Sequence, residues 1–192
     1  MIVLKETLAR RYGFGDTMAD ELIQLFEPIN YPKHAFMVQQ RAMSDCLFYV
    51  SKGLAREFYT FDGLNDEDNT TQFIKEGDFY FSINSFLEDK PADCYTQILE
   101  PVKAFILTKE VIDSHDDSSL ILTRLINHVF KDCLIRQSDR INIFMKSRKS
   151  ADRYADFINL NPDLANRLPD KLIASYLGIN SSTLSRIRSA VP

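Results

Sequence analysis

The stretch 170-DKLIASYLGINSSTLSRIR-188 decides how the C-terminal part of the chain folds. It reads as two short amphipathic helices that meet at a corner, which is the pattern of a helix-turn-helix. Such a hairpin needs a small residue where the helices cross, a glycine with a left-handed backbone at the corner, and apolar residues between the helices. All seven positions fit this pattern: Ala174 at the crossing, Gly178 at the corner, and Ile173, Leu177, Ile179, Leu184 and Ile187 between the helices.

The second helix is predicted over 181–190, with Asn180 as its N-cap and with Leu184 and Ile187 facing inward. Small hydroxyl side chains let a helix enter the major groove of DNA closely, and an arginine can bind guanine through two hydrogen bonds. The alternative is a structural hairpin with a solvated polar face. We favour DNA binding. The candidate contacts are Ser181, Ser182, Thr183, Ser185, Arg186, Arg188 and Ser189. Among them, Thr183 and Arg188 are placed for contact with phosphate.

The distribution of charge supports a polyanionic partner for this region only. The whole chain has a formal net charge of −4, which by itself argues against nucleic-acid binding. From Arg140 onward, however, nine Lys and Arg residues stand against four Asp, so this part carries +5 and the remainder −9. An acidic body followed by a basic segment indicates two modules, although ordinary charge scatter is the alternative.

Upstream, residues 33–107 consist of short apolar runs separated by turn residues, which favours an antiparallel β-roll or barrel. We predict a hairpin with strands at 46–50 and 54–61 and a turn at Ser51-Lys52-Gly53. Further strands are predicted at 70–74, 95–99 and 102–107, with an acidic loop tip at 62–69 and a turn at Glu100-Pro101. Residues 81–89 lack the alternation of a strand, so they form a short helix or a loop at which a ligand site could lie.

A long helix is predicted over 118–146, because this segment contains neither Pro nor Gly and its apolar residues recur with helical period. Its stripe Leu122, Ile126, Val129 and Cys133 has the spacing 4, 3, 4 that is typical of a helix pair. The stripe packs either on its own domain or on a second copy of the chain, and we favour a homodimer. Residues 147–152 form a polar hinge, followed by helical pieces at 153–160 and 162–168.

At this point the chain resembles the Crp/Fnr transcription regulators, in particular the type found in Bacteroidetes. The resemblance rests on LFYVSKGLAREF (47–58), FIKEGDFYFSINSFLEDKPADCYTQILEPVKAFIL (73–107) and RLPDKLIASYLGINSSTLSRIR (167–188). It implies an α+β fold: an antiparallel β-roll (a double-stranded β-helix, cyclic-nucleotide-binding-like) at 1–117, a dimerisation helix at 118–146, and a small all-α helix-turn-helix domain at 147–192. It also implies a homodimer that regulates transcription by placing two recognition helices on a near-palindromic site in double-stranded DNA. Relatives often carry a two-stranded wing after the recognition helix, and because the chain stops at Pro192 we expect none here.

The chain departs from the family in the cassette that holds the cyclic phosphate of cyclic AMP. Relatives use Gly-Glu and, some ten residues on, Arg followed by Ser or Thr; here Phe81-Ser82 and Ala92-Asp93 take those places. Ala92 offers no cation and Asp93 adds a repelling carboxylate, so we expect no ordinary binding of cyclic AMP or cyclic GMP. The roll either binds an unidentified small-molecule effector or is a ligand-free scaffold; the candidate pocket residues are Phe81, Ser82, Ile83, Phe86, Ala92 and Asp93.

No cofactor or metal is predicted. Cys46, Cys94 and Cys133 are far apart, and the three histidines are isolated, so neither an iron–sulfur nor a zinc site is indicated. No nucleophile–base pattern or phosphate-binding loop suggests an enzyme. The N-terminus lacks a signal peptide and no apolar run would span a membrane, so we expect a cytoplasmic protein. The competing hypothesis is a ligand-sensing or protein-interaction module of the same fold whose helix-turn-helix no longer binds DNA.

Overall fold

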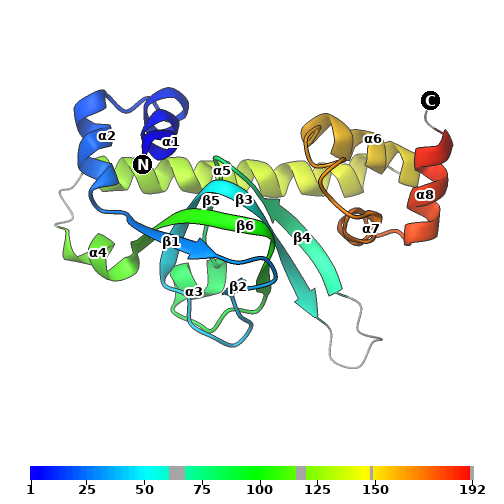
Figure 1. The fold of residues 1–192 in the computed structure, drawn as a ribbon, viewed down its shortest axis with the longest axis horizontal. Helices are drawn as coiled ribbons and strands as arrows, with labels where there is room; N and C mark the ends of the chain where they lie inside the picture. The colour runs from blue at the N-terminus through cyan, green and yellow to red at the C-terminus, as the bar shows by residue number, and fades with distance from the viewer. Residues whose placement is uncertain (61–67, 116–119, 148, 191–192) are drawn as a thin grey trace. The chain divides into compact units, whose positions relative to one another are not determined.

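The computed structural model describes residues 1–60, 68–115, 120–147 and 149–190. Figure 1 labels the helices and strands along the chain. Contacts divide the chain into two compact units, the first formed by residues 1–59 and 72–131 and the second by 60–71 and 132–192. The long helix α5 (Leu120–Lys146) therefore contributes to both units. Residues 60–71, which precede and begin strand β4, belong to the same unit as the C-terminal helices.

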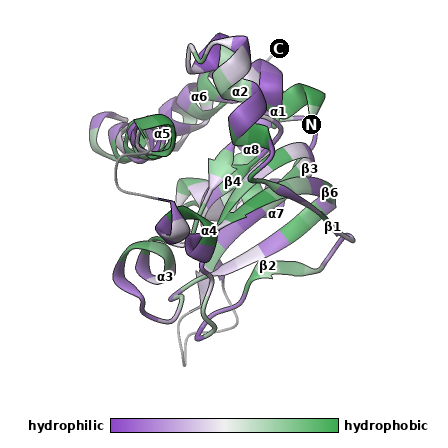
Figure 2. Cartoon of the chain, turned by 90° about the vertical axis from the view of Figure 1, so that its left-hand side faces the viewer, coloured by the Kyte–Doolittle hydropathy of each residue, from purple (hydrophilic) through white to green (hydrophobic). Residues whose placement is uncertain are grey.

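The sheet has the order β1–β6–β3–β4, with β2 beside β6 and β5 beside β3. The pairs β1–β6, β2–β6, β3–β5 and β3–β6 are antiparallel. Both hydrophobic and hydrophilic residues occur along the strands (Figure 2). Strand β3 has two continuous buried runs, and the sheet encloses a core that includes Val50, Ala55 and Ile98. The strands are β1 (Glu27–Tyr31), β2 (Phe36–Val38), β3 (Cys46–Thr60), β4 (Asp68–Ile74), β5 (Phe79–Tyr80) and β6 (Tyr95–Thr108).

Two of the predicted turns are wrong. Strand β3 runs without interruption through Ser51-Lys52-Gly53, and β6 runs through Glu100-Pro101. The two segments lie opposite each other in the β3–β6 pair, where the register shifts at Val50/Lys52 and Lys52/Leu54. Gly53 has φ +100° because the strand bulges there, and a Cβ at this position would lie 2.3 Å from the Pro101 carbonyl oxygen. The glycine signal therefore marked a bulge with a close backbone approach rather than a chain reversal.

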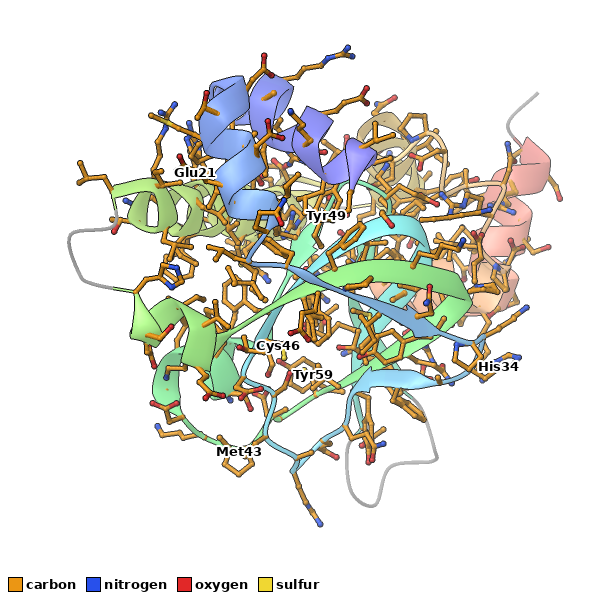
Figure 3. The ribbon with its side chains drawn as sticks, turned by 60° about the vertical axis from the view of Figure 1, so that its left-hand side comes forward. Glu21, His34, Met43, Cys46, Tyr49 and Tyr59 are labelled. Carbon is orange, nitrogen blue, oxygen red and sulfur yellow. The ribbon has the colours of Figure 1, made fainter. Side chains whose placement is uncertain are left out.

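The first unit also contains helices at the N-terminus, between the strands and after the last strand. They are α1 (Ile2–Glu6), the π-helix η1 (Thr7–Arg11), α2 (Asp16–Ile23), α3 (Ile83–Glu88) and α4 (Lys109–Ser114). Segment 81–89, predicted as helix or loop, thus contains a helix. Tyr49 on β3 lies below the N-terminal helices (Figure 3), and its hydroxyl is 2.6 Å from Thr7 Oγ1 and donates to the Val3 carbonyl. These contacts fix the N-terminal helices to the sheet.

The second unit contains the end of α5 and three short helices, α6 (Ser150–Leu160), α7 (Asp170–Leu177) and α8 (Ser181–Ala190). The predicted helical piece at 162–168 forms turns instead, because the Leu164 and Arg167 amides bond carbonyls only three residues back. The core of the unit consists of buried apolar residues: Ile143, Phe157, Leu164, Leu168, Ile173, Leu177 and Leu184. None of the helices in the described ranges combines the length and apolar character needed to cross a bilayer.

Candidate nucleic-acid interface and the interior of the β-roll

The corner between α7 and α8 has the geometry predicted for a helix-turn-helix. Gly178 adopts the left-handed conformation with φ 62° and ψ 38°. A Cβ there would lie 3.3 Å from the Phe144 ring, so the position is tight as well as left-handed. Ile173, Ala174, Leu177 and Leu184 are all at most 1% exposed. These buried side chains pack α7 against α8.

The start of α8 is fixed by the predicted N-cap. Asn180 Oδ1 accepts a hydrogen bond of 2.8 Å from the Thr183 amide and another of 2.9 Å from the Ser182 hydroxyl. The side chain thereby satisfies one of the amides that a helix leaves unpaired in its first turn. The cap positions the first turn of α8 with its serines facing away from the domain core.

The outward face of α8 is polar and exposed. Leu184 is fully buried, Thr183 and Ile187 are partly buried, and the exposed residues are Ser181, Ser182, Ser185, Arg186 and Ser189. Arg186 makes only long contacts within its own helix, 3.4 Å from Nε to the Ser182 carbonyl and 3.5 Å from Nη2 to Thr183 Oγ1. No Asp or Glu follows Asp170 in the sequence, so this face has no carboxylate of its own.

Arg188, which the sequence placed among the phosphate contacts, is held inside the domain. Its Nη1 lies 2.6 Å from the Asp170 carboxylate, its Nε donates to the Tyr154 hydroxyl at 2.9 Å, and its Nη2 donates to the Ala165 carbonyl at 2.7 Å. The guanidinium therefore connects α8 to α6, to α7 and to the turn segment 162–168. These contacts support a structural role for Arg188, and they neutralise its charge locally.

We predict that Arg188→Ala lowers the free energy of unfolding by about 1–2 kcal/mol, because it removes two hydrogen bonds and a partly exposed ion pair. Urea denaturation measures this change. Arg186→Ala is the matched control and should stay within about 0.5 kcal/mol of wild type, since its side chain is exposed. An Arg188→Ala protein of unchanged stability but weaker, less salt-dependent DNA binding would make Arg188 a phosphate contact instead.

The residues of the candidate pocket in the β-roll are only partly brought together. Phe81, Phe86 and Ala92 are buried, and the Phe81 ring lies 5.3 Å from Phe86 and 5.5 Å from Phe130 of α5. Ile83 is 45% exposed and Asp93 is also exposed, so these two side chains do not line the core. Phe81 therefore acts as core packing between α3 and α5. Ser82 is buried, and its Oγ has no hydrogen-bond partner among the described residues.

The interior of the roll next to Ala92 and Asp93 contains a buried carboxylate that the sequence did not reveal. Glu57 Oε2 accepts hydrogen bonds from the Tyr80 hydroxyl at 3.0 Å and the Gln72 amide at 3.1 Å. The Tyr80 hydroxyl also lies 2.6 Å from Thr96 Oγ1. Burial, and then the charge of Glu57, raise the pKa of Tyr80 and of Cys94, so both stay protonated at neutral pH. The Glu57 carboxyl group thus belongs to a buried hydrogen-bonded cluster inside the roll.

Arg41 is a basic residue beside Ala92 of the cassette, and the sequence analysis did not connect it with this site. The Arg41 amide donates to the Ala92 carbonyl at 2.7 Å, and the Ala92 amide donates back to the Ala42 carbonyl at 2.9 Å. Arg41 is exposed and has φ 67°, an uncommon conformation for a residue with a side chain. Only the pairing of two loops that are distant in sequence brings them together, so no local pattern could have identified this neighbour.

The stripe predicted for the dimer helix is largely occupied within one chain. Leu122 is 5% exposed and Val129 is fully buried, while Ile126 and Cys133 are partly buried. Apart from Leu120 at the first position of α5, which is 79% exposed, the exposed large apolar residues of the helix lie in its second half: Leu134 at 71%, Ile135 at 48%, Ile141 at 59% and Met145 at 77%. Leu134, Ile141 and Met145 follow one another at spacings of seven and four residues, so they share one face of the helix.

The described residues contain no group of three or more His, Cys, Asp or Glu side chains that could hold a metal ion. Burial and the adjacent Asp45 raise the pKa of Cys46 to about 12, so this half-buried thiol is not a reactive thiolate.

Comparison with known proteins adds structural relatives only. No protein-family model and no curated protein sequence matches the chain. FixK2 from Bradyrhizobium japonicum matches with a TM-score of 0.72 at 15% identity, covering 85% of this chain and 83% of FixK2. The c-di-GMP-responsive global regulator CLP of Xanthomonas campestris matches with a TM-score of 0.69 at 13% identity, covering 91% and 90%. A CooA mutant from Carboxydothermus hydrogenoformans matches with a TM-score of 0.68 at 17% identity, covering 97% of this chain and 82% of the CooA chain.

These matches are structural similarities to Crp/Fnr regulators at low sequence identity. They confirm the predicted fold, an antiparallel sheet followed by a long helix and C-terminal helices. The matches extend over most of both chains, so the similarity is not limited to the sheet or to the helices alone.

Proposed function

We propose that the protein is a DNA-binding transcription regulator, a homodimer that reads a near-palindromic site in double-stranded DNA through α8. The observation that carries this proposal is the outward face of α8, where four exposed serines and Arg186 surround a helix fixed by a left-handed glycine corner and an asparagine cap. Serines let the helix backbone approach base edges, and the long arginine reaches acceptors on guanine. The regulators that share the fold support the same function.

We place the homodimer interface on the exposed face of α5 formed by Leu134, Ile141 and Met145, with Ile135 beside it. Each of these side chains is at least 48% exposed in the single chain. Large apolar side chains repeated along one helix face are unfavourable in water and are covered when two such helices pair. A two-fold pair of this kind brings two copies of α8 to one duplex, as a palindromic site requires.

Arg186→Ala is expected to weaken binding to the cognate site by about 1–3 kcal/mol and to relax the preference at one base position in each half-site. Titration of fluorescent duplexes that differ at single positions measures both effects. Arg186→Lys is the matched control: it keeps the charge but cannot bind a guanine through two hydrogen bonds, so it should retain non-specific affinity and lose the preference. An equal loss on every duplex would make Arg186 a phosphate contact.

A second function, a ligand-sensing or protein-interaction module that does not bind DNA, is favoured by one observation. With Arg188 held by Asp170, Tyr154 and the Ala165 carbonyl, Arg186 is the one exposed basic residue on the described part of α8. This hypothesis predicts no salt-dependent affinity for any duplex, whereas binding through phosphates weakens steeply with salt.

The roll is proposed not to bind cyclic AMP or cyclic GMP in the manner of the family. Ala92 provides no guanidinium for the cyclic phosphate, and the Glu57 carboxylate and Asp93 would repel it. Calorimetry with either nucleotide should show no heat of binding at about 100 μM ligand, a concentration at which micromolar sites are saturated. Micromolar binding that is lost in Arg41→Ala would contradict the proposal and would identify Arg41 as the missing cation.

A further inference from the structure

The free edge of strand β4 is closed by side chains of the helix-turn-helix unit. β4 is the last strand in the order β1–β6–β3–β4, so only one of its sides faces another strand of the described sheet. In a strand the backbone groups of residues 68 and 70 point to the same side, because the pattern repeats every second residue. At an edge these groups need partners from elsewhere.

Ser175 of α7 supplies those partners with a single hydroxyl group. Its Oγ accepts a hydrogen bond of 2.9 Å from the Thr70 amide and donates one of 2.8 Å to the Asp68 carbonyl. The same oxygen lies 3.2 Å from Thr70 Oγ1, and Thr70 is fully buried. The hydroxyl thus acts as donor and acceptor together, as the backbone of a neighbouring strand would.

Arg140 of α5 completes the contact. Its Nη2 donates to the Thr70 carbonyl at 3.3 Å, and its guanidinium lies 5.5 Å from the ring centres of both Phe144 and Tyr176. The arginine therefore stacks between aromatic residues of α5 and α7 while it binds the strand. Strand β4, α5 and α7 therefore meet at the buried Thr70, and all three residues of the contact belong to the second unit.

We propose that the contact between Ser175, Thr70 and Arg140 positions the recognition helix and sets which half-site spacing the dimer accepts; this inference rests on the proposed function. α7 and α8 share a tightly packed core, so whatever holds α7 also holds α8. Among the described residues, α7 and its corner also lie against α5, through Arg140 beside the Tyr176 ring and the Phe144 ring beside Gly178. A second tether reduces the orientations that α8 samples, and a dimer that must meet two grooves at once benefits from this pre-organisation.

The test uses the full-length protein, Ser175→Ala, and a series of palindromic duplexes whose half-site spacing is changed by one or two base pairs. We expect wild type to lose at least tenfold in affinity on altered spacings, because one base pair rotates a half-site by about a tenth of a helical turn. Ser175→Ala should bind the optimal palindrome about three- to tenfold more weakly, as expected for the loss of two hydrogen bonds, and should discriminate little between spacings. A duplex with a single half-site should be bound equally by both proteins.

Three controls distinguish a positioning role of the Ser175 hydroxyl from a general effect of removing a hydroxyl group. Ser175→Thr keeps the hydroxyl and should restore the discrimination, and Ser114→Ala removes a hydroxyl that bonds only within α4 and should behave as wild type. Exchange of the Thr70 amide proton should be faster in Ser175→Ala than in wild type, whether or not DNA is present. Equal losses on single and paired half-sites, unchanged spacing discrimination or unchanged Thr70 exchange would each overturn the inference. Wild type that binds no duplex would instead overturn the proposed function.

Discussion

Ile141→Glu is expected to convert the homodimer into monomers and to abolish tight binding to palindromic DNA. Burying an isoleucine side chain contributes about 1.5–3 kcal/mol, and a two-fold interface loses that contribution twice. The dissociation constant of the dimer should therefore rise at least about a hundredfold, since every 1.4 kcal/mol is a factor of ten. Analytical ultracentrifugation measures the change, and affinity for a palindrome should fall to that for a single half-site.

Two further substitutions on α5 serve as controls for this prediction. Ile141→Leu keeps an apolar side chain at the same exposed position and should remain dimeric. Val129→Glu places a charge at a position that is fully buried within one chain, so it should unfold the protein rather than separate the subunits. A folded and dimeric Ile141→Glu protein would show that the interface lies elsewhere than on the exposed face of α5.

Gly53→Ala is expected to lower the free energy of unfolding by about 3 kcal/mol or more, at the high end of single substitutions. The added Cβ would lie 2.3 Å from the Pro101 carbonyl oxygen and 2.9 Å from both Pro101 C and Val102 Cα, all of them backbone atoms. Relief of this overlap requires β3 and β6 to move apart where they are paired. The backbone at φ +100° adds strain for any residue with a side chain.

Gly77→Ala and Gly15→Ala isolate the two contributions to that loss. Gly77 has φ +87° and no atom within 4 Å of a Cβ, so alanine there adds backbone strain alone, about 1 kcal/mol. Gly15 has open space and no positive φ, so its substitution should be close to neutral. Urea titrations should show the largest loss in free energy of unfolding for Gly53→Ala, a smaller loss for Gly77→Ala and almost none for Gly15→Ala. A loss at Gly53 no larger than that at Gly77 would refute the close approach of β3 to Pro101.

The parts of the fold that follow from local pattern could be predicted from the sequence. The corner at Gly178, the cap at Asn180 and the length of α5 all depend on residues within a few turns of each other, and the structure confirms them. The strands were harder, because Gly53 and Glu100-Pro101 read as turns in isolation. Each becomes a bulge only because the other lies opposite it in the β3–β6 pair, and that pairing is not local.

The candidate DNA-binding site likewise combines features that local sequence predicts with features that depend on distant segments of the chain. The exposure of Ser181, Ser182, Ser185 and Arg186 follows from the period of α8, which the sequence displays. The role of Arg188 could not be predicted, because its partners Tyr154 and Ala165 lie on other segments of the domain. The contact of Ser175 with β4 is equally non-local, since it joins residues more than a hundred positions apart. Burial of Leu122 and Val129 likewise depends on how the first half of α5 packs on its own unit.

Selection of binding sites from random duplex DNA by the full-length protein, with no ligand added, tests the central claim most directly. The account predicts an enriched near-palindrome whose half-sites are centred about one helical turn apart, as two copies of α8 on a two-fold dimer require. It further predicts that the enrichment decreases steeply with salt concentration. A selection at low salt that enriches no sequence above background would contradict the proposal that α8 reads DNA in this protein.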